Sequence, residues 1–300
     1  MNKVNVFTVI LNTNRRDDTL ACLAALHHST YKRHTIIVLD NASTDGSAEA
    51  IKAEFPRVEL IHLKENKGYA GNNNVGIAAA VAQGADWVYV LNEDTIQAPD
   101  CLDHLVAVGE SDPTIGIVGP MVYHADNPDV IQSAGGWIDH HWQAGHKGQN
   151  DPDKGQFAEP HAVAWVSGCA IMVRREVIEQ LGMLDEHFFY YWEETEWCVR
   201  TKRAGWKIMH VPQARLWHKG VQIDYRPGPN VAYYNTRNYL MMLRKHEAPT
   251  TVRLRAWYRI LRTYTSMSLK PERKTNLEAR QAMVQGMGDF WRGRVGKRKT

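Results

Sequence analysis

The stretch VLNEDT at residues 90–95 joins the end of an apolar run to two acidic residues. We expect residues 87–91 to form a buried strand, which places Glu93 and Asp94 just beyond its carboxyl end. A second acidic cluster, EETE at residues 193–196, follows much later in the chain. Two carboxylate sites suit a reaction that needs a metal-bound diphosphate and a separate general base, although each cluster alone is equally compatible with a solvated turn or a helix start.

On either side of this stretch, apolar runs alternate with segments of helical periodicity. We expect strands at residues 5–11, 35–39, 58–63 and 87–91, and helices at residues 17–27, 46–54 and 73–83. Strands that alternate with helices form a mostly parallel, Rossmann-like α/β sheet with helices on both faces. Ligands bind such sheets beyond the carboxyl ends of the strands, so Asp40, Lys67 and Asp94 are predicted to share one rim.

The second half of the chain is less regular. Residues 122–164 are rich in Gly, His, Asp and Pro, which is typical of a loop that shapes a substrate site. Regular patterning then returns, with an apolar segment at 164–174, helices at 176–181 and 193–203, a strand at 206–211, and helices after Pro229.

The charge is unevenly distributed along the chain. The net charge is +3, but residues 244–300 hold 15 Lys and Arg against 4 Asp and Glu, while the preceding residues hold 21 against 29. A basic extension on an acidic body indicates an anionic partner, such as a membrane surface, a lipid phosphate or nucleic acid, unless its charges only solvate a helix. Trp257, Leu261 and Tyr264 lie on one side of a predicted helix with arginines beside them, as in interfacial helices. The alternative is that these helices pack on the body or form a homodimer interface.

Cysteine usage and hydropathy bear on the compartment. The four cysteines have no C-x-x-C spacing, so we expect a reducing environment. The short apolar run at the start is better explained by a first strand than by a signal peptide, and no stretch approaches the roughly 20 apolar residues of a membrane span. We therefore predict a cytoplasmic protein, located at the inner face of the cell membrane where the basic extension binds it.

Three positions on the predicted rim are candidates for ligand binding. Asp40 can accept hydrogen bonds from a base or a ribose hydroxyl, or can instead cap a helix. The glycines of KGYAGNNN at residues 67–74 can admit a ligand close to the backbone, although a tight turn explains them equally well. Asp94 is the best candidate ligand for Mg²⁺ or Mn²⁺, because these ions are often held by one or two carboxylates and substrate phosphates. His218 can join it or be structural.

Glu193 and Glu194 are candidates for the general base. Both fall where a helix is predicted to begin, so the helix dipole favours their ionised forms, and an ionised carboxylate can accept a proton from an attacking hydroxyl. Acidic residues are also common in first turns without any catalytic role. The aromatic run FFYYW at residues 188–192 favours the functional interpretation, because it would place these acids beside a surface that stacks on sugars.

Several ordered motifs resemble family-2 glycosyltransferases, which have the GT-A fold and an inverting mechanism, and most closely their rhamnosyltransferase-like branch. The resemblance covers about residues 6–243, and its motifs are VILNTNR (9–15), VLDNASTDGS (38–47), NKGYAGNNNVGI (66–77), LNEDT (91–95), VSGCAIMVRREVI (166–178), GMLDEHFFYYWEETEWCVR (182–200) and ARLWHKG (214–220). It implies a nucleotide-sugar-binding half at 1–121, an acceptor-binding and catalytic half of the same domain at 122–228, and a basic helical extension at 229–300.

The resemblance also implies roles for individual residues. The donor nucleotide sugar would be held by residues of the first rim, which are Leu11, Asn12, Thr13, Asp40, Lys67, Gly71, Asn74, Asn92 and Glu93. Asp94 occupies the place of the metal-binding aspartate, and His218 matches a histidine that approaches the metal. Glu194 matches the catalytic base, although the family usually has Asp there, and Trp192 and Glu193 would lie toward the acceptor.

The implied reaction is a single displacement in which Glu194 deprotonates an acceptor hydroxyl that attacks the anomeric carbon. The donor would be a dTDP- or UDP-sugar, with rhamnose first, and the acceptor a glycan or a lipid-linked glycan. A nucleotide-sugar pyrophosphorylase would need a glycine-rich loop after the first strand, which LNTNR at residues 11–15 does not provide. A non-catalytic sugar- or membrane-binding module would not need both acidic clusters. Only the basic extension suggests nucleic acid, and we predict no nucleic-acid partner.

Overall fold

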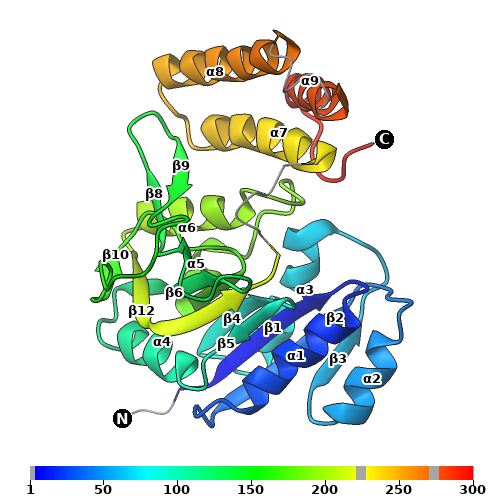
Figure 1. Cartoon of the computed structure of the whole chain (residues 1–300), viewed down its shortest axis with the longest axis vertical. Coiled ribbons are helices and arrows are strands. Elements are labelled where there is room, and N and C mark those ends of the chain that lie inside the picture. The colour runs from blue at the N-terminus through cyan, green and yellow to red at the C-terminus, as the bar shows by residue number, and fades with distance from the viewer. Residues whose placement is uncertain (1–3, 221–227, 270–276, 300) are drawn as a thin grey trace.

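The computed structural model describes residues 4–220, 228–269 and 277–299, so parts of the expected domains lie outside the described residues. A central sheet lies between layers of helices, and three more helices stack above one end of this body (Figure 1). This mixed α/β architecture, with a helical C-terminal part, is the predicted one.

Four parallel strands form the N-terminal half of the sheet, namely β1 (Val6–Asn12), β2 (His34–Asp40), β3 (Glu59–His62) and β4 (Trp87–Asn92). In β1 every residue except Leu11 is buried, as expected for a strand whose two faces are both covered. The register pairs Asn12 with Asp40 and Leu11 with Asn92. Three strands therefore end side by side, as the sequence predicts.

The other strands extend the sheet and add a hairpin, and they are β5 (Thr95–Gln97), β6 (Ile115–His124), β7 (Ile131–Ser133), β8 (Gly136–Ile138), β9 (Ala144–His146), β10 (His161–Ala162), β11 (Ala170–Arg174) and β12 (Lys207–His218). The order across the sheet is β10-β12-β6-β11-β4-β1-β2-β3, with β5 beside β12 and β7 beside β6. Strand β11 runs antiparallel between β4 and β6, and β6 runs parallel to β12. The sheet therefore continues without a break from the N-terminal half into the second half.

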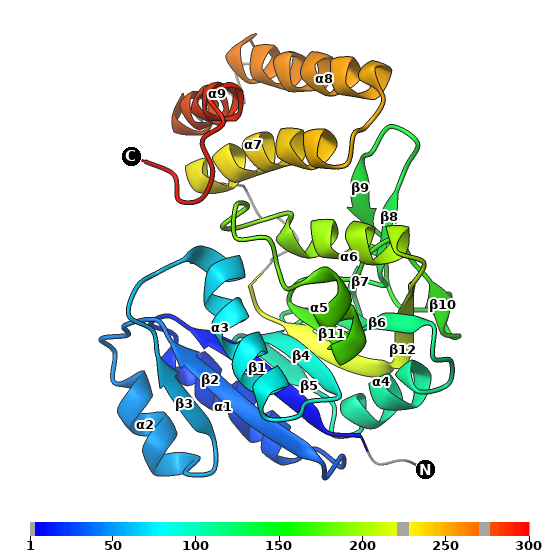
Figure 2. The same ribbon diagram turned by 180° about the vertical axis from the view of Figure 1, so that it is seen from behind.

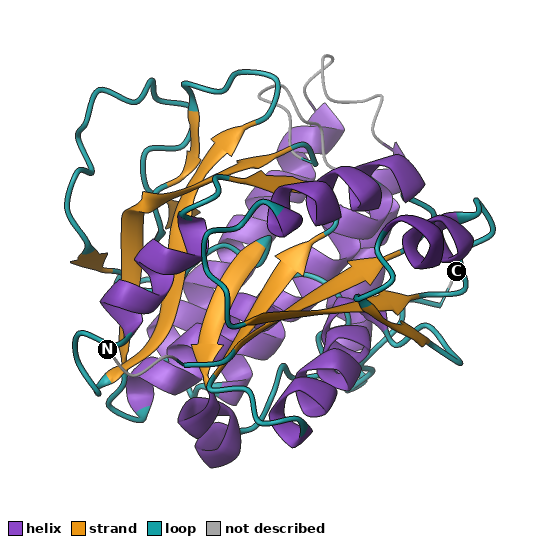
Figure 3. Ribbon diagram, turned by 90° about the horizontal axis from the view of Figure 1, so that it is seen from below, coloured by secondary structure: helices purple, strands orange, loops and turns teal. Residues whose placement is uncertain are grey.

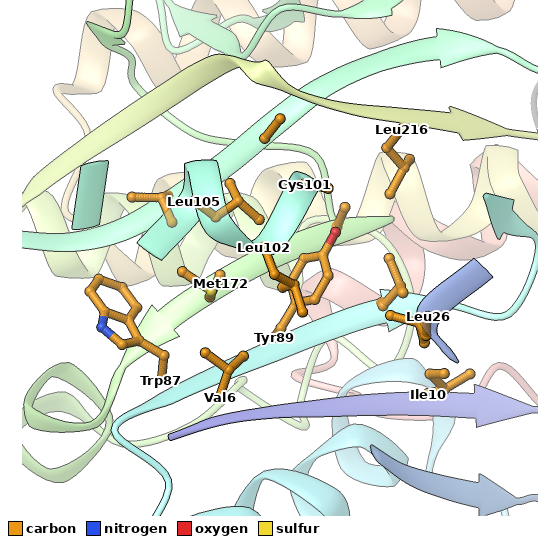
Figure 4. Packing of buried hydrophobic residues seen from close by; sticks show 14 of the residues in the cluster. Val6, Ile10, Leu26, Trp87, Tyr89, Cys101, Leu102, Leu105, Met172 and Leu216 are labelled. Atoms are coloured by element: carbon orange, nitrogen blue, oxygen red, sulfur yellow. The ribbon is translucent and has the colours of Figure 1, made fainter. Parts of the chain in front are cut away.

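Helices cover both faces of the sheet, as Figure 3 shows. One apolar core lies under α1 (Arg16–His27), α2 (Ser47–Glu54) and α4 (Cys101–Gly109). Figure 4 shows part of this core, in which Trp87 and Tyr89 of β4 pack near Leu102 and Leu105 of α4. The opposite core lies under α3 (Gly68–Ala82), α5 (Arg175–Leu181) and α6 (Glu193–Arg203).

The last three helices, α7 (Pro229–Lys245), α8 (Thr250–Leu269) and α9 (Leu277–Trp291), lie together above the body (Figure 2). They share a hydrophobic core that also includes Phe188. Trp257 and Tyr264 are partly buried and pack against this core. The exposed apolar side chains of α8 are Leu254, Tyr258 and Leu261, which are 65%, 66% and 51% exposed. These three lie at helical spacing i, i+4 and i+7 and form one stripe.

Three boundaries differ from the prediction. Helix α3 begins at Gly68 and not at residue 73, because the side chain of Asn66 accepts from the Gly68 amide and that of Asn72 accepts from the Lys67 amide. The supposed turn is therefore the first turn of a helix. Strand β12 continues to His218, and residues 122–164 contain short strands in place of one irregular loop.

Gly76 lets α3 pack directly on the sheet, and this yields a stability prediction. A Cβ at Gly76 would lie 2.4 Å from Val9 Cγ1 and 3.2 Å from Leu39 Cδ1. Overpacking of a filled core typically costs about 1–3 kcal/mol. We expect Gly76→Ala to lower the free energy of unfolding by about that amount in a urea titration. Gly228→Ala is the control, because nothing lies within 4 Å of its Cβ position. Equal midpoints for the two variants would contradict the packing argument.

Candidate active site

The ends of β1 and β2 hold a buried polar pair. Asn12 Nδ2 donates to Asp40 Oδ1 at 3.2 Å and to Ser43 Oγ at 3.0 Å, while Asn12 Oδ1 accepts from Thr19 Oγ1 at 2.9 Å. His62 Nδ1 lies 3.3 Å from Asp40 Oδ2. These contacts fix the buried Asp40 carboxylate at the carboxyl edge of the sheet.

Other residues that the sequence assigns to donor binding differ in their exposure and in their hydrogen-bond partners. Thr13 is exposed, and its hydroxyl accepts from Asn41 Nδ2 at 3.2 Å. Lys67 reaches Glu65 at 3.2 Å. Asn74 differs, because its Nδ2 donates to the Leu184 carbonyl at 2.9 Å and its Oδ1 accepts from the Leu184 amide at 3.1 Å. Its amide group is thus engaged in holding a loop.

The remaining donor candidates lie close to protein atoms. Leu11 is partly buried and packs on the core beneath α3. A Cβ at Gly71 would lie 2.5 Å from Lys67 Cβ, so this position in the first turns of α3 has no room for a side chain. The Asn92 carbonyl accepts from Thr95 Oγ1 at 2.7 Å, which shapes the turn that carries Glu93 and Asp94.

Asp94 and His218 come together although they are far apart in sequence. Strand β5 follows Asp94 directly and pairs with the end of β12, with His218 opposite Thr95. His218 Nε2 consequently lies 3.2 Å from Asp94 Oδ1, and both side chains are buried. His218 Nδ1 lies 2.8 Å from Oε1 of Gln132, a residue of β7 that the sequence analysis did not identify.

Arg15, from the turn after β1, brings positive charge to this acidic pair. Its guanidinium lies 3.5 Å from Asp94 Oδ2 and 4.0 Å from Glu93 Oε1. Burial alone would raise the pKa of Asp94, but His218 and Arg15 hold that pKa below its usual value. Burial, together with the charge of Asp94, raises the pKa of Glu93 to about 7. Asp94 is therefore ionised at neutral pH, whereas Glu93 is only partly ionised.

The surroundings of Asp94 fit a divalent cation. Asp94 Oδ1 is buried and has no hydrogen-bond partner among the described residues. A protonated His218 pairs with Asp94 and lowers its pKa, whereas in the neutral tautomer whose Nδ1–H donates to Gln132 the Nε2 lone pair faces this oxygen, an arrangement that suits a divalent cation. A Cβ at Gly220 would lie 2.6 Å from Asp94 Oδ2, so glycine keeps the place open. Within the described ranges no cluster of three or more His, Cys, Asp or Glu could hold a metal, so further ligands would come from a diphosphate and water.

Glu193 and Glu194 begin α6 and form a second acidic site. Glu193 is buried, and its Oε2 has no hydrogen-bond partner in the part of the chain that the structure describes. Glu194 lies against Gly168, where an added Cβ would be 3.1 Å from its Cγ. Burial raises the pKa of both, and the charge of Glu194 raises that of Glu193 further. The pair as a whole therefore binds a proton more readily than ordinary glutamates do.

An aromatic loop, residues 188–192, leads into these acids. Phe189, Tyr191 and Trp192 have φ values of 65°, 68° and 75°, which are uncommon for bulky residues. Trp192 Nε1 donates to Asn235 Oδ1 at 3.1 Å, and its ring lies 5.1 Å from that of Tyr239 in α7. Helix α7 thus contacts the loop that leads into the acid pair.

Residues 8–182 match the family described as Glycosyl transferase family 2. The chain belongs to this family. One curated relative is N-acetylglucosaminyl-diphospho-decaprenol L-rhamnosyltransferase of Mycobacterium tuberculosis. This chain is 28% identical to it over 251 residues, with 75% of this chain and 79% of the relative covered. It is 25% identical over 260 residues to dTDP-rhamnosyl transferase RfbF of Shigella flexneri, with 84% of each chain covered. The predicted enzyme class and its rhamnosyltransferase-like branch are confirmed.

A solved structure shares the fold of this family-2 glycosyltransferase. Mannosyltransferase PcManGT from Pyrobaculum calidifontis, in complex with GDP-Man and Mn²⁺, superposes with a TM-score of 0.60 over 97% of this chain and 88% of that one, at 15% identity. The fold is the predicted GT-A fold. The family match includes Asp94 but ends before the acid pair of α6, so the roles of Glu193 and Glu194 depend on the geometry described above.

Proposed function

We propose that this enzyme is a metal-dependent, inverting glycosyltransferase that moves a sugar, rhamnose or a hexose, from a nucleoside-diphosphate donor to a hydroxyl acceptor. The observation that carries the proposal is the presence of two buried carboxylate sites of different character. One is Asp94, which is kept ionised beside His218 and Arg15. The other is the Glu193–Glu194 pair, whose pKa values are raised. Different environments for two acidic sites indicate different roles.

Each group has a task in the proposed step. Asn12 and Asp40 hold the nucleoside, and Asp94 and His218 hold Mg²⁺ or Mn²⁺. Such an ion, when bound, offsets the charge of the diphosphate. Glu194 accepts the proton of the acceptor hydroxyl, whose oxygen forms a bond to the anomeric carbon from the face opposite the diphosphate. The bond from that carbon to the diphosphate breaks, and the configuration inverts.

The two curated relatives support the choice of substrates. Their names describe a dTDP-rhamnosyl transferase and a rhamnosyltransferase that acts on N-acetylglucosaminyl-diphospho-decaprenol. We infer a dTDP- or UDP-sugar donor and a glycan or lipid-linked acceptor, in the assembly of a cell-surface polysaccharide or glycoconjugate. A donor screen tests this proposal by measuring nucleoside diphosphate release, with dTDP-rhamnose first and UDP-hexoses and GDP-mannose as the alternatives. Sugar transfer from none of these donors to any glycan or lipid-linked acceptor would overturn it.

The basic extension supports action at a membrane surface. Among the described residues no helix is both long and apolar enough to cross a bilayer. Helix α8 instead lies at the outer end of the molecule (Figure 1) and carries the stripe Leu254, Tyr258 and Leu261. The exposed Arg255 and Arg262 lie on one flank of this stripe. An apolar stripe with a basic flank is suited to the cytoplasmic face of a membrane that contains anionic lipids.

Asp94 can be tested by direct metal binding. We expect Asp94→Ala to weaken Mn²⁺ binding in the presence of dTDP or UDP by at least about tenfold, because loss of even an outer-shell partner costs that much. Electron paramagnetic resonance of free Mn²⁺ measures the affinity. Asp126→Ala is the control, since Asp126 is an exposed acid on another loop. Unchanged affinity in Asp94→Ala would remove this residue from the metal site.

Glu194 can be tested through kcat and its pH dependence. A general base acts when ionised, and burial raises the pKa of Glu194, so activity should fall as pH drops through a value above the ordinary glutamate range. We expect Glu194→Gln to lower kcat by about 10²–10⁴-fold with little change in donor KM, and to abolish that acid limb. If Glu193→Gln shows this loss and Glu194→Gln does not, the base is Glu193.

Vesicle binding tests the stripe of α8. We expect sedimentation with vesicles containing anionic phosphatidylglycerol but not with neutral phosphatidylcholine, and loss of binding in high salt. Replacing Arg255 and Arg262 with Gln should weaken binding by about 1 kcal/mol each. Leu254→Ser together with Leu261→Ser should weaken it on both vesicle types. Equal partitioning of the wild type onto neutral and anionic vesicles, or onto neither, would favour a packing or dimer role for these helices.

A further inference from the structure

Two adjacent residues of α7, Arg237 and Asn238, contact the backbone of the aromatic loop on the side that faces the C-terminal helices. Asn238 Nδ2 lies within hydrogen-bond distance of three backbone carbonyls of the loop, those of Phe188 and Tyr190 at 2.9 Å and that of Tyr191 at 2.8 Å. Arg237 donates to the Phe188 carbonyl at 2.9 Å. The two side chains thus donate to the backbone of a loop in which three residues have left-handed conformations.

These two side chains also fix each other. Arg237 Nε donates to Asn238 Oδ1 at 2.9 Å, which turns the amide nitrogen of Asn238 toward the loop. Both side chains are fully buried, at 0% exposure. The guanidinium also lies over the rings of Tyr233 and Tyr234, at 5.2 and 5.1 Å from their centroids. Contacts with carbonyl oxygens and aromatic ring faces hold a buried guanidinium in one orientation.

The opposite side of the loop lies against α3. The Phe189 carbonyl accepts from the Ala70 amide at 3.4 Å. A Cβ at Gly68, whose φ is +77°, would lie 2.3 Å from the same carbonyl oxygen. The loop therefore lies between α3 and α7 and makes contacts with both. Glu193 and Glu194 follow it without an intervening residue.

We propose that Arg237 and Asn238 are positioning residues, which hold the aromatic loop so that the Glu193–Glu194 pair is presented to the acceptor hydroxyl. The inference rests on the proposed function and extends it to α7, which lies beyond residues 8–182 of the family match. It assigns the C-terminal extension a part in the transfer step besides any contact with a membrane. Arg237 also donates to the Gly296 carbonyl at 2.6 Å, so truncation near residue 244 would disturb the loop as well as the surface of α8.

The main test compares variants of one asparagine. Asn238→Asp keeps the size and the acceptor for Arg237 but removes the donor to the loop carbonyls, and Asn238→Ala removes both. Asn230→Ala is the matched control, because Asn230 is exposed on the same helix. We expect both Asn238 variants to lower kcat by about 10–100-fold, since a small misplacement of a catalytic group can cost 10²-fold, with the Kd for dTDP or UDP unchanged. The control should retain wild-type kinetics.

A double-mutant cycle separates positioning from general loss of structure. If Asn238 acts through Glu194, adding Asn238→Asp to Glu194→Gln should lower kcat much less than it does in the wild type, because the two changes remove one effect. A merely structural role would lower the active fraction equally in both backgrounds. If Asn238→Ala does not fold, the kinetics of Asn238→Asp and the double-mutant cycle still distinguish positioning from a general structural role. Full additivity, or wild-type kcat in Asn238→Asp, would overturn the inference.

Hydrogen exchange gives a readout that does not depend on activity. The amides of residues 188–196 should exchange faster in Asn238→Asp than in the wild type, while those of β1 and β4 stay unchanged. Unchanged exchange in the loop would refute the proposed contact. If the wild type transfers no sugar but the loop amides respond as expected, the proposed function fails and the role of α7 in holding the loop stands.

Discussion

The cost of burying carboxylates is the constraint on which the arrangement of this site depends. Asp40, Asp94 and Glu193 are all buried, and the described residues around them supply fewer cations than carboxylates. A buried acid must be paired, hydrogen-bonded or protonated. The chain uses all three solutions, since Asn12 donates to Asp40, Arg15 and His218 keep Asp94 ionised, and the Glu193–Glu194 pair binds a proton more readily than ordinary glutamates do. Under the proposed function, the ionised Asp94 suits a cationic ligand and the raised pKa values of the α6 acids suit proton transfer.

The N-terminal half of the fold was predictable because each local pattern agrees with the global one. Apolar runs that are covered on both faces identify β1, β2 and β4, and the acids beyond them share one edge through the parallel register. The start of α3 was missed because its amides are capped by asparagine side chains, whose effect depends on the folded turn. The length of β12 was missed because Pro212 and the exposed Gln213 and Arg215 interrupt its apolar pattern in mid-strand, where its pairing with β6 also shifts register.

The positions of candidate site residues could be predicted from the sequence only where those residues lie in a recognisable motif. Asp94 follows a clear strand, whereas the role of Gln132 arises from the pairing of β7 with β6 and has no local signal. Arg15 lies inside a motif of the family resemblance, and its proximity to Asp94 is visible only in three dimensions. Periodicity places Trp257, Leu261 and Tyr264 on one side of α8 but does not say which neighbour covers them, and here Trp257 packs against Phe290 and Trp291 of α9. The support of the aromatic loop by α7 could not be inferred, because it depends on backbone carbonyls.

The four cysteines have a practical consequence. Each is a free thiol within the core, and burial raises the pKa of Cys22, Cys169 and Cys198 to about 12 and that of Cys101 further still. Since the thiolate is the reactive form, all four should resist alkylation in the folded protein. A cysteine introduced on the outer stripe of α8 could therefore be labelled selectively with a fluorophore without prior removal of the native thiols. The approach of that helix to a lipid surface could then be followed in an otherwise unaltered enzyme.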